Sequence, residues 1–351
     1  MNYSIIRYII GWVMVMEAVL LLLPAVVSLI YQEKSFWAFL SVAVLCGIAG
    51  GLSVLRKPKS KVFYSREGFV TVALCWIVLS LVGTLPFMIS GDIPVFIDAL
   101  FETVSGFTTT GASVLADVEA LSRGAAFWRS FTHWIGGMGV LVFVIAILPL
   151  AGGYNIHLLK AESPGHNVSK LVPKVRTTAL ILYSIYILMT GVEIVILLIS
   201  GMPWFDAFTL SFGTAGTGGF GILNDSVASY TAFQQWTITI FMILFGINFN
   251  FYFCLLIRKP LQGFKMEELR YYFGFIIGAI ILIAFNIRNL CSGWEETFRH
   301  ASFQVGSVIT TTGYSTTDFD LWPQFSKCIL FLLMFIGACS GSTGGGVKVS
   351  R

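Results

Sequence analysis

The sequence predicts an all-α integral membrane protein with a leading helix hairpin and repeated helix–short helix–helix units around one axis. Three observations support this prediction. Of the 351 residues, 56% are hydrophobic and only 11% are charged, whereas soluble domains carry about 25% charged residues. Several hydrophobic runs reach the roughly 20 residues that cross a bilayer. Three short Thr/Gly-rich segments recur between these runs.

Eight hydrophobic runs are candidates for membrane-spanning helices. They occupy residues 5–30, 36–55, 68–90, 125–150, 177–200, 231–257, 272–290 and 325–349. The first run does not read as a signal peptide, because it is too long and continues into Tyr31-Gln32-Glu33-Lys34 rather than a small-residue cleavage site. We therefore expect a multi-pass protein whose first run is part of the leading hairpin.

The basic residues predict the orientation of the chain. Of 22 Lys and Arg, 13 lie in three loops that each follow an even-numbered run: Arg56, Lys57, Lys59, Lys61, Arg66; Lys160, Lys170, Lys174, Arg176; and Arg258, Lys259, Lys265, Arg270. Short loops rich in Lys and Arg stay on the cytoplasmic side. This pattern places the N-terminus in the cytoplasm and accounts for the net charge of +4 without nucleic-acid binding.

Three Thr/Gly-rich segments repeat along the chain: Thr108-Thr109-Thr110-Gly111, Gly216-Thr217-Gly218-Gly219 and Thr310-Thr311-Thr312-Gly313. Aligned on Gly111, Gly218 and Gly313, they are spaced by 107 and 95 residues. Each follows a short apolar stretch (95–107, 204–213 and 295–308) that is too short to cross a membrane and fits a re-entrant helix. Non-helical backbone at membrane depth is tolerated only where it lines a wet cavity or is buried in protein.

The Thr/Gly segments predict a cation pathway lined by backbone oxygens. Thr310-Thr311-Thr312-Gly313-Tyr314 is close to the TVGYG pattern whose carbonyls coordinate K⁺. Glycine is required because consecutive carbonyls face one axis only if the backbone visits regions closed to other residues. The expected K⁺-binding filter residues are Thr109, Thr110, Gly111, Gly216, Thr217, Gly218, Thr311, Thr312 and Gly313. For a single segment, an ordinary polar turn is the alternative, and three copies favour the pore.

A second candidate site is the glycine-rich segment 337–348 inside the last hydrophobic run. Its residues do not fit a nucleotide-binding loop, because Val347 separates Gly346 from Lys348 and no strand precedes it. Five glycines disfavour a continuous helix. The segment is either a kink for close helix packing or a mobile plug below the filter, and we favour the plug. The predicted gating loop comprises Gly341, Ser342, Thr343, Gly344, Gly345 and Gly346.

The remaining polar residues favour structure over catalysis. Glu102 lies within the first short segment and must line water or be paired. Asp98, Asp206, Glu295 and Glu296 lie near the starts of the short helices, where acids complement the helix dipole. The six cysteines and four histidines show no metal-ligand spacing. We expect no enzyme, no covalent cofactor, and K⁺ as the bound and transported ion.

The repeats define the domain organisation. We expect a leading transmembrane hairpin over 1–60, pore repeat 1 over 61–155, pore repeat 2 over 156–260 and pore repeat 3 over 261–351. A ring with four carbonyl donors per layer needs a fourth repeat, which the sequence does not contain. Truncation or a contribution from another polypeptide would explain this, and truncation is the favoured explanation.

At these residues the chain resembles the Trk/Ktr/HKT superfamily of potassium transporters, most closely its bacterial TrkH branch. The resemblance rests on Ser65-Arg66-Glu67-Gly68-Phe69, Ser105 to Ala112, Trp134 to Gly139, Gly218-Gly219-Phe220, Thr312-Gly313-Tyr314 and Gly341 to Gly346. It implies a pseudo-fourfold pore, a homodimer in the bacterial inner membrane and a cytoplasmic, TrkA-like nucleotide-binding regulatory subunit. It also implies that three of the four filter strands match the loops above and that the glycine-rich segment is the gating loop.

Three functions remain open at this stage. The first is channel-like K⁺ uptake, gated by the glycine-rich loop. The second is K⁺/H⁺ or K⁺/Na⁺ symport, for which Glu102 is the one weak candidate for a titratable site. The third is a non-conducting membrane subunit.

Overall fold

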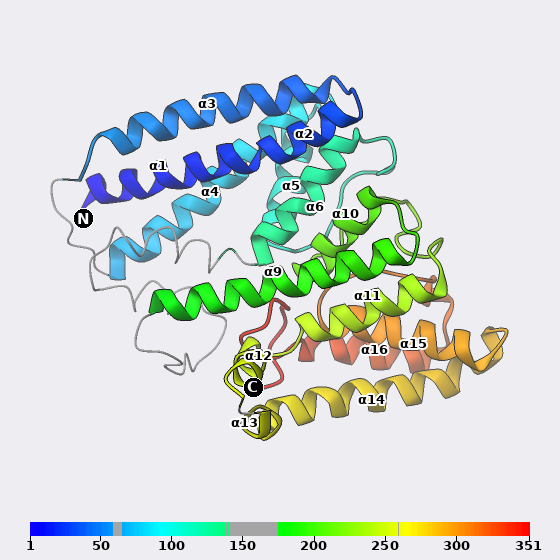
Figure 1. The fold of residues 1–351 in the computed structure, drawn as a ribbon. Helices are drawn as coiled ribbons and strands as arrows, with labels where there is room; N and C mark the ends of the chain where they lie inside the picture. The colour runs from blue at the N-terminus through cyan, green and yellow to red at the C-terminus, as the bar shows by residue number, and fades with distance from the viewer. Residues whose placement is uncertain (59–64, 138, 140–174, 259) are drawn as a thin grey trace. The chain divides into compact units, whose positions relative to one another are not determined.

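The computed structural model describes residues 1–58, 65–137, 139, 175–258 and 260–351. Helices and irregular segments account for all of these residues, so the predicted all-α class is confirmed. The chain divides into two compact units, Met1–Leu180 and Ile181–Arg351. Figure 1 shows the helices of each unit by label.

The first unit contains the leading hairpin and the first short helix. Its helices are α1 (Tyr3–Leu20), α2 (Leu22–Ile30), α3 (Ser35–Leu55), α4 (Ser65–Ser90), α5 (Phe96–Phe107) and α6 (Arg123–Gly137). Helices α1 and α3 lie side by side (Figure 1). They approach so closely that a Cβ on Gly50 would lie 2.7 Å from the carbonyl oxygen of Gly11. Trp128 of α6 is fully buried against Phe107 of α5, and its indole donates a 3.0 Å hydrogen bond to the Gly83 carbonyl of α4.

The second unit contains the other two short helices. Its elements are most of α9 (Val175–Ile199, whose first residues belong to the first unit), α10 (Trp204–Ala215), α11 (Ala232–Phe245), α12 (Phe249–Leu256), α13 (Pro260–Phe264), α14 (Glu267–Ile287), α15 (Trp294–Ile309) and α16 (Gln324–Ile336), with short 3-10 turns at Arg288–Leu290 and Phe319–Leu321. Helix α15 packs against α11, α14 and α16. A buried apolar core that includes Ile276, Ile283, Ala301, Val305 and Leu330 joins these helices.

Five of the predicted spans are helices long and apolar enough to cross a membrane: Tyr3–Ile30, Ser35–Leu55, Arg66–Ser90, Leu180–Ile199 and Glu267–Leu290. Their outer faces carry large exposed apolar side chains, as Phe275, Ile277 and Phe285 do on α14. Such faces are stable in contact with lipid and would be costly in water.

The predicted span 231–257 is not one continuous helix. It breaks into α11 and α12, which meet at 89°. Gly246 ends α11, and the Asn248 side chain accepts a 3.0 Å hydrogen bond from the Asn250 amide at the start of α12. A Cβ on Gly246 would lie 2.8 Å from Thr310 Cγ2, so the break allows the close approach of the third Thr/Gly segment.

The predicted span 325–349 is helical only in its first part, and the glycine-rich segment inside it is not helical. Helix α16 ends at Ile336, because Gly337 has a φ of 72° and the following residues are irregular. The predicted span 125–150 is helical from Arg123 to Gly137, and its second half lies outside the described residues. Lys59, Lys61, Lys160, Lys170, Lys174 and Lys259, which contributed to the predicted orientation, also lie outside them.

The three short apolar segments form helices as predicted. Helices α5 and α10 have 12 residues each and α15 has 16, so α5 and α10 are each too short to cross a bilayer. Each ends directly at a Thr/Gly segment. The acids near their starts lie in the first turn, where they complement the helix dipole: Asp98 in α5, Asp206 in α10, and Glu295 and Glu296 in α15.

Candidate functional site

The three Thr/Gly loops share one backbone conformation. In each loop a threonine has a positive φ and a glycine two residues later has one as well: Thr109 (54°) with Gly111 (73°), Thr217 (53°) with Gly219 (74°), and Thr311 (60°) with Gly313 (91°). A β-branched residue at positive φ is strained, and such strain is typical of functional sites. The same strained turn occurring three times indicates one structural role for all three loops.

Hydrogen bonds to the preceding helix repeat in the same register. The amides of Thr110, Gly218 and Thr312 donate to the carbonyls of Ser105, Gly213 and Ser307 at 2.9, 3.0 and 2.8 Å. The threonine with positive φ in each loop donates to the carbonyl three residues earlier. The helix end therefore fixes each loop by its amides.

This register differs by one residue from the predicted one in the second loop. Gly219, and not Gly218, has the backbone conformation of Gly111 and Gly313, while Gly216 matches Thr108 and Thr310 by its hydrogen bond to the carbonyl four residues earlier. The sequence misled because the second segment contains three glycines and no Thr-Thr pair to fix the alignment. The signal that identifies Gly219 is the aromatic Phe220 after it, which corresponds to Tyr314 after Gly313.

Most amides of the loops donate hydrogen bonds to the preceding helix, but three carbonyls in each loop accept none from the described residues. Within the described part of the chain, no hydrogen bond ends on the backbone oxygens of nine loop residues: Thr109, Thr110, Gly111, Thr217, Gly218, Gly219, Thr311, Thr312 and Gly313. Backbone carbonyls in folded proteins are nearly always paired with protein or water. Three unpaired oxygens on each loop are donors of the kind that bind a hard cation.

The second and third loops are in direct contact. A Cβ on Gly219 would lie 1.9 Å from the carbonyl oxygen of Thr312, so only glycine fits there. Beyond the loops, the Val227 amide donates to the Ser315 carbonyl at 3.0 Å, and the Ser315 amide donates to the Ser226 hydroxyl at 3.2 Å. The segments that follow the two loops are therefore joined.

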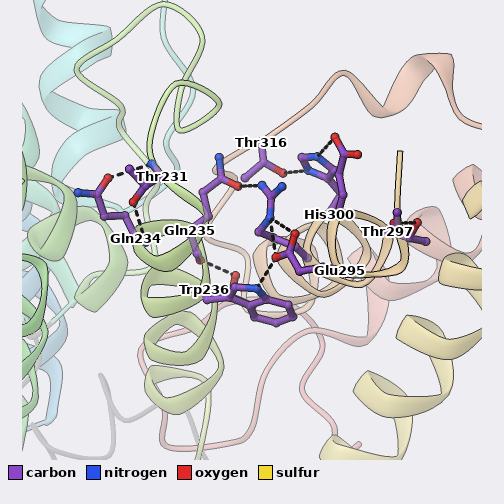
Figure 2. A network of polar contacts seen from close by, with 12 residues as sticks. Thr231, Gln234, Gln235, Trp236, Glu295, Thr297, His300 and Thr316 are labelled. Carbon is purple, nitrogen blue, oxygen red and sulfur yellow. Dashed lines mark hydrogen bonds and ion pairs between the residues drawn. The ribbon is translucent and has the colours of Figure 1, made fainter. Parts of the chain in front are cut away.

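A polar network outside these loops links α11 and α15 (Figure 2). Glu295 accepts hydrogen bonds from the Trp236 indole at 3.0 Å and from Arg299 at 3.1 Å, and Arg299 also donates to the Gln235 side chain. Gln235 in turn donates to the carbonyls of Val227, Ala228 and Tyr230 at 3.0–3.1 Å. The third short helix is thereby connected to the segment that follows the second loop.

Two further contacts stabilise the outer end of α15. The His300 ring lies 2.8 Å from the Thr316 hydroxyl (Figure 2). The Ser292 amide donates a 2.7 Å hydrogen bond to Glu296, and this bond lowers the pKa of the Glu296 carboxyl. Because the Glu296 pKa is lower in the folded protein than in the unfolded chain, the bond stabilises the fold at pH values above the ordinary carboxyl pKa. This contribution is lost as the pH falls through the lowered pKa.

Glu102 is paired rather than free. Its carboxylate binds Arg129 of α6 at 2.8 Å, and both side chains are almost completely buried. It also accepts hydrogen bonds from the Ser113 hydroxyl at 2.6 Å and the Val114 amide at 2.7 Å. Glu102 therefore anchors the segment after the first loop, which agrees with the prediction that it must line water or be paired.

The glycine-rich segment folds back against the third loop. The Gly345 amide donates a 2.7 Å hydrogen bond to the Thr311 hydroxyl, and a Cβ on Gly344 would lie 2.8 Å from the Thr310 carbonyl oxygen. Lys348 also donates to the Gly344 carbonyl. The predicted gating loop, Gly341 to Gly346, thus contacts the predicted filter within the second unit.

The same segment is fixed to the break between α11 and α12. The Cys339 amide donates to the Gly246 carbonyl and the Phe249 amide to the Gly341 carbonyl, each at 3.0 Å. Glu268 at the start of α14 accepts hydrogen bonds from the Ser340 amide at 2.5 Å and from the Asn248 side chain at 3.3 Å. The segment is therefore a structured loop with specific anchors and not a kinked helix.

Apolar spanning helices, short helices that end at carbonyl-presenting loops, and a folded glycine-rich loop define a multi-pass membrane transport protein. The sequence matches the TrkH family, described as cation transport protein, over residues 35–288 and 293–351. It is 36% identical to the Trk system potassium uptake protein TrkH of Escherichia coli (strain K12) and 34% identical to that of Halomonas elongata, in each case over 100% of this chain and 74% of the relative.

A solved structure agrees with these sequence matches. The crystal structure of the potassium transporter TrkH from Vibrio parahaemolyticus superposes with a TM-score of 0.87 at 30% identity, covering 100% of this chain and 74% of that one. The chain belongs to the TrkH family of cation transport proteins.

Proposed function

We propose that this protein conducts K⁺ across the bacterial inner membrane through a filter of backbone carbonyls. The observation that carries this proposal is that three loops share one pattern of positive φ, and that each has three backbone carbonyl oxygens without a hydrogen bond from any described residue. K⁺ is a hard cation that exchanges its water for such oxygens. The relatives named as potassium uptake proteins support K⁺ as the ion. The filter strands are then Thr109–Gly111, Thr217–Gly219 and Thr311–Gly313.

In this proposal the glycine-rich loop, Gly341 to Gly346, is the gate. Its hydrogen bond to Thr311 holds it against the third filter strand, and its anchors on Gly246, Phe249 and Glu268 define a closed position. Opening requires these few contacts to break. The glycines allow the backbone to change conformation without side-chain clashes.

The proposed assembly follows the family resemblance. The protein forms a homodimer with a cytoplasmic N-terminus, and a TrkA-like nucleotide-binding subunit regulates the gate. The leading hairpin covers 1–60, and the pore repeats cover 61–155, 156–260 and 261–351. Coupled K⁺/H⁺ or K⁺/Na⁺ symport is less well supported, because Glu102, the candidate titratable group, is bound to Arg129.

Cation flux in liposomes tests the proposal. We expect the full-length protein to carry K⁺ in preference to Na⁺ and to follow the K⁺ Nernst potential across imposed pH and Na⁺ gradients. Gly111→Ser and Gly313→Ser should admit Na⁺, because both glycines have positive φ. Unchanged K⁺/Na⁺ flux ratios in both variants would refute the filter. A reversal potential that shifts with pH or Na⁺ would establish symport, and the absence of any flux would favour a non-conducting subunit.

A further inference from the structure

A hydrogen bond from a serine hydroxyl to a loop carbonyl occurs in the first and third loops, but the second loop has no serine to form it. The Ser105 hydroxyl donates to the Ala112 carbonyl and the Ser307 hydroxyl to the Tyr314 carbonyl, each at 2.6 Å. Both serines stand six residues before the glycine with positive φ, and both bonds hold the first carbonyl after that glycine. At the corresponding position of the second loop, six residues before Gly219, stands Gly213, which has no hydroxyl.

The carbonyl of the second loop is nevertheless bonded, by a side chain from the third loop. The Tyr314 hydroxyl lies 3.3 Å from the Phe220 carbonyl, which corresponds to the Ala112 and Tyr314 carbonyls, and 3.1 Å from the Leu210 carbonyl of α10. Tyr314 is 1% exposed and packs in an apolar cluster with Leu210 and Phe303. Because buried tyrosines normally use their hydroxyl, this contact is part of the fold.

The Tyr314 hydroxyl leaves room only for glycine at position 213. A Cβ on Gly213 would lie 2.1 Å from the Tyr314 hydroxyl oxygen and 3.1 Å from Cζ. A serine at position 213 and a tyrosine hydroxyl at this position therefore cannot coexist without movement. The hydroxyl oxygen of Tyr314 occupies the space that the serine side chain fills in the other two loops.

We propose that Tyr314 is a positioning residue that supplies, from the third loop, the hydroxyl that the second loop lacks. Its side chain thereby sets the position of the second filter strand relative to the third, and ion selectivity depends on it. This inference rests on the proposed carbonyl filter. The second strand is then held by its own helix through its amides and by the neighbouring loop through the Phe220 carbonyl.

Tyr314→Phe tests the inference in the full-length protein, measured as the K⁺/Na⁺ flux ratio in liposomes. Removing the hydroxyl leaves the Phe220 carbonyl without this partner while the ring still fills the cluster, and we expect the ratio to fall about tenfold. Tyr252→Phe is the matched control. It also loses a tyrosine–carbonyl hydrogen bond, to Leu244 of α11 at 2.7 Å, but none to a Thr/Gly loop, and should keep the ratio.

A rescue variant separates this role from a general loss of packing. In Tyr314→Phe the hydroxyl that clashes with a side chain at 213 is gone and only the 3.1 Å approach to ring Cζ remains, which a small shift of the ring relieves, so adding Gly213→Ser should restore the serine bond present in the other loops. We expect the double variant to recover the ratio to within about twofold of the wild type. Gly213→Ser alone should reduce the yield of folded protein.

The outcomes distinguish this inference from the proposed function. If wild-type protein shows no K⁺ preference, the carbonyl filter itself is refuted. If the wild type is selective and Tyr314→Phe keeps the wild-type ratio, only the positioning role is overturned. A fall in Tyr314→Phe that Gly213→Ser does not reverse also overturns it, because the effect then comes from altered packing.

Discussion

The backbone amide of Gly345 donates a 2.7 Å hydrogen bond to the side-chain hydroxyl of Thr311. This bond joins the glycine-rich loop to the third Thr/Gly loop, in which Thr311 is the threonine with positive φ. The proposed gate and the proposed filter therefore meet at one threonine. A side chain that serves both elements couples the position of the gate to the conformation of the filter strand.

Thr311→Val should open the gate more often. Valine keeps the β-branched shape but removes the acceptor of the Gly345 amide, at a cost of about 1 kcal/mol to the closed position. We expect K⁺ leak to rise about fivefold in liposomes without any regulatory subunit. Thr311→Ser retains the hydroxyl and is the control. Equal leak in both variants would show that this bond does not hold the loop.

Glu268→Ala should also raise the leak. The carboxylate accepts from the Ser340 amide and the Asn248 side chain, so it joins the loop to the break between α11 and α12. Glu267 is adjacent on the same helix and exposed, which makes Glu267→Ala the matched control. Deletion of 341–346 should produce a leak at least as large as that of Glu268→Ala, and a deletion without effect would remove the gate from the proposal.

Gly219→Ala should abolish K⁺ selectivity or folding. The residue has a φ of 74°, and an added Cβ would lie 1.9 Å from the Thr312 carbonyl oxygen. Gly221→Ala, two residues on, is the control, since its nearest neighbour would be at an ordinary 3.4 Å. Comparing folded yield by size-exclusion chromatography and then flux ratios decides between the two effects. Normal yield and normal selectivity in Gly219→Ala would contradict the contact between the loops.

The sequence was sufficient to predict the helical class, the three short helices and the three loops, because hydrophobic run length and the repeated Thr/Gly pattern are local signals. It indicated that glycines disfavour a continuous helix in the last span, but it did not predict the break between α11 and α12. At the break, Gly246 lies against Tyr272 and Thr310, and the loop after α16 is held by contacts with residues about 90 positions earlier, so both features involve residues distant in the sequence. The register of the second loop was missed because its three glycines allow more than one alignment, which the positive φ of Gly219 and its contact with Thr312 resolve.

The hydrogen bonds of Gln235 should stabilise the segment that follows the second loop. Gln235→Leu removes three hydrogen bonds to the carbonyls of Val227, Ala228 and Tyr230 and the acceptor of Arg299. We expect a loss of about 2–3 kcal/mol in stability, because buried polar groups lose their partners. Trp236→Phe removes a single bond to the exposed Glu295 and should cost less than about 1 kcal/mol. Thermal unfolding in detergent measures both, and equal melting temperatures would contradict the network's role.

Breaking the buried pair of Glu102 and Arg129 should be more harmful than removing both charges. Glu102→Gln removes the carboxylate that pairs with the buried Arg129 guanidinium, and breaking such a buried pair costs about 3–5 kcal/mol. The variant Glu102→Gln with Arg129→Gln removes both charges and should recover part of that stability, because no isolated charge remains. The glutamine at 102 can still accept from the Ser113 hydroxyl or the Val114 amide, so the segment after the first loop keeps an anchor.

If Glu102 instead carried a proton during transport, the double variant would be stable but its flux would lose any dependence on the pH gradient. Measuring melting temperature and flux across a pH gradient on the same samples separates these outcomes. We expect partial recovery of stability and a flux that depends on the K⁺ gradient alone.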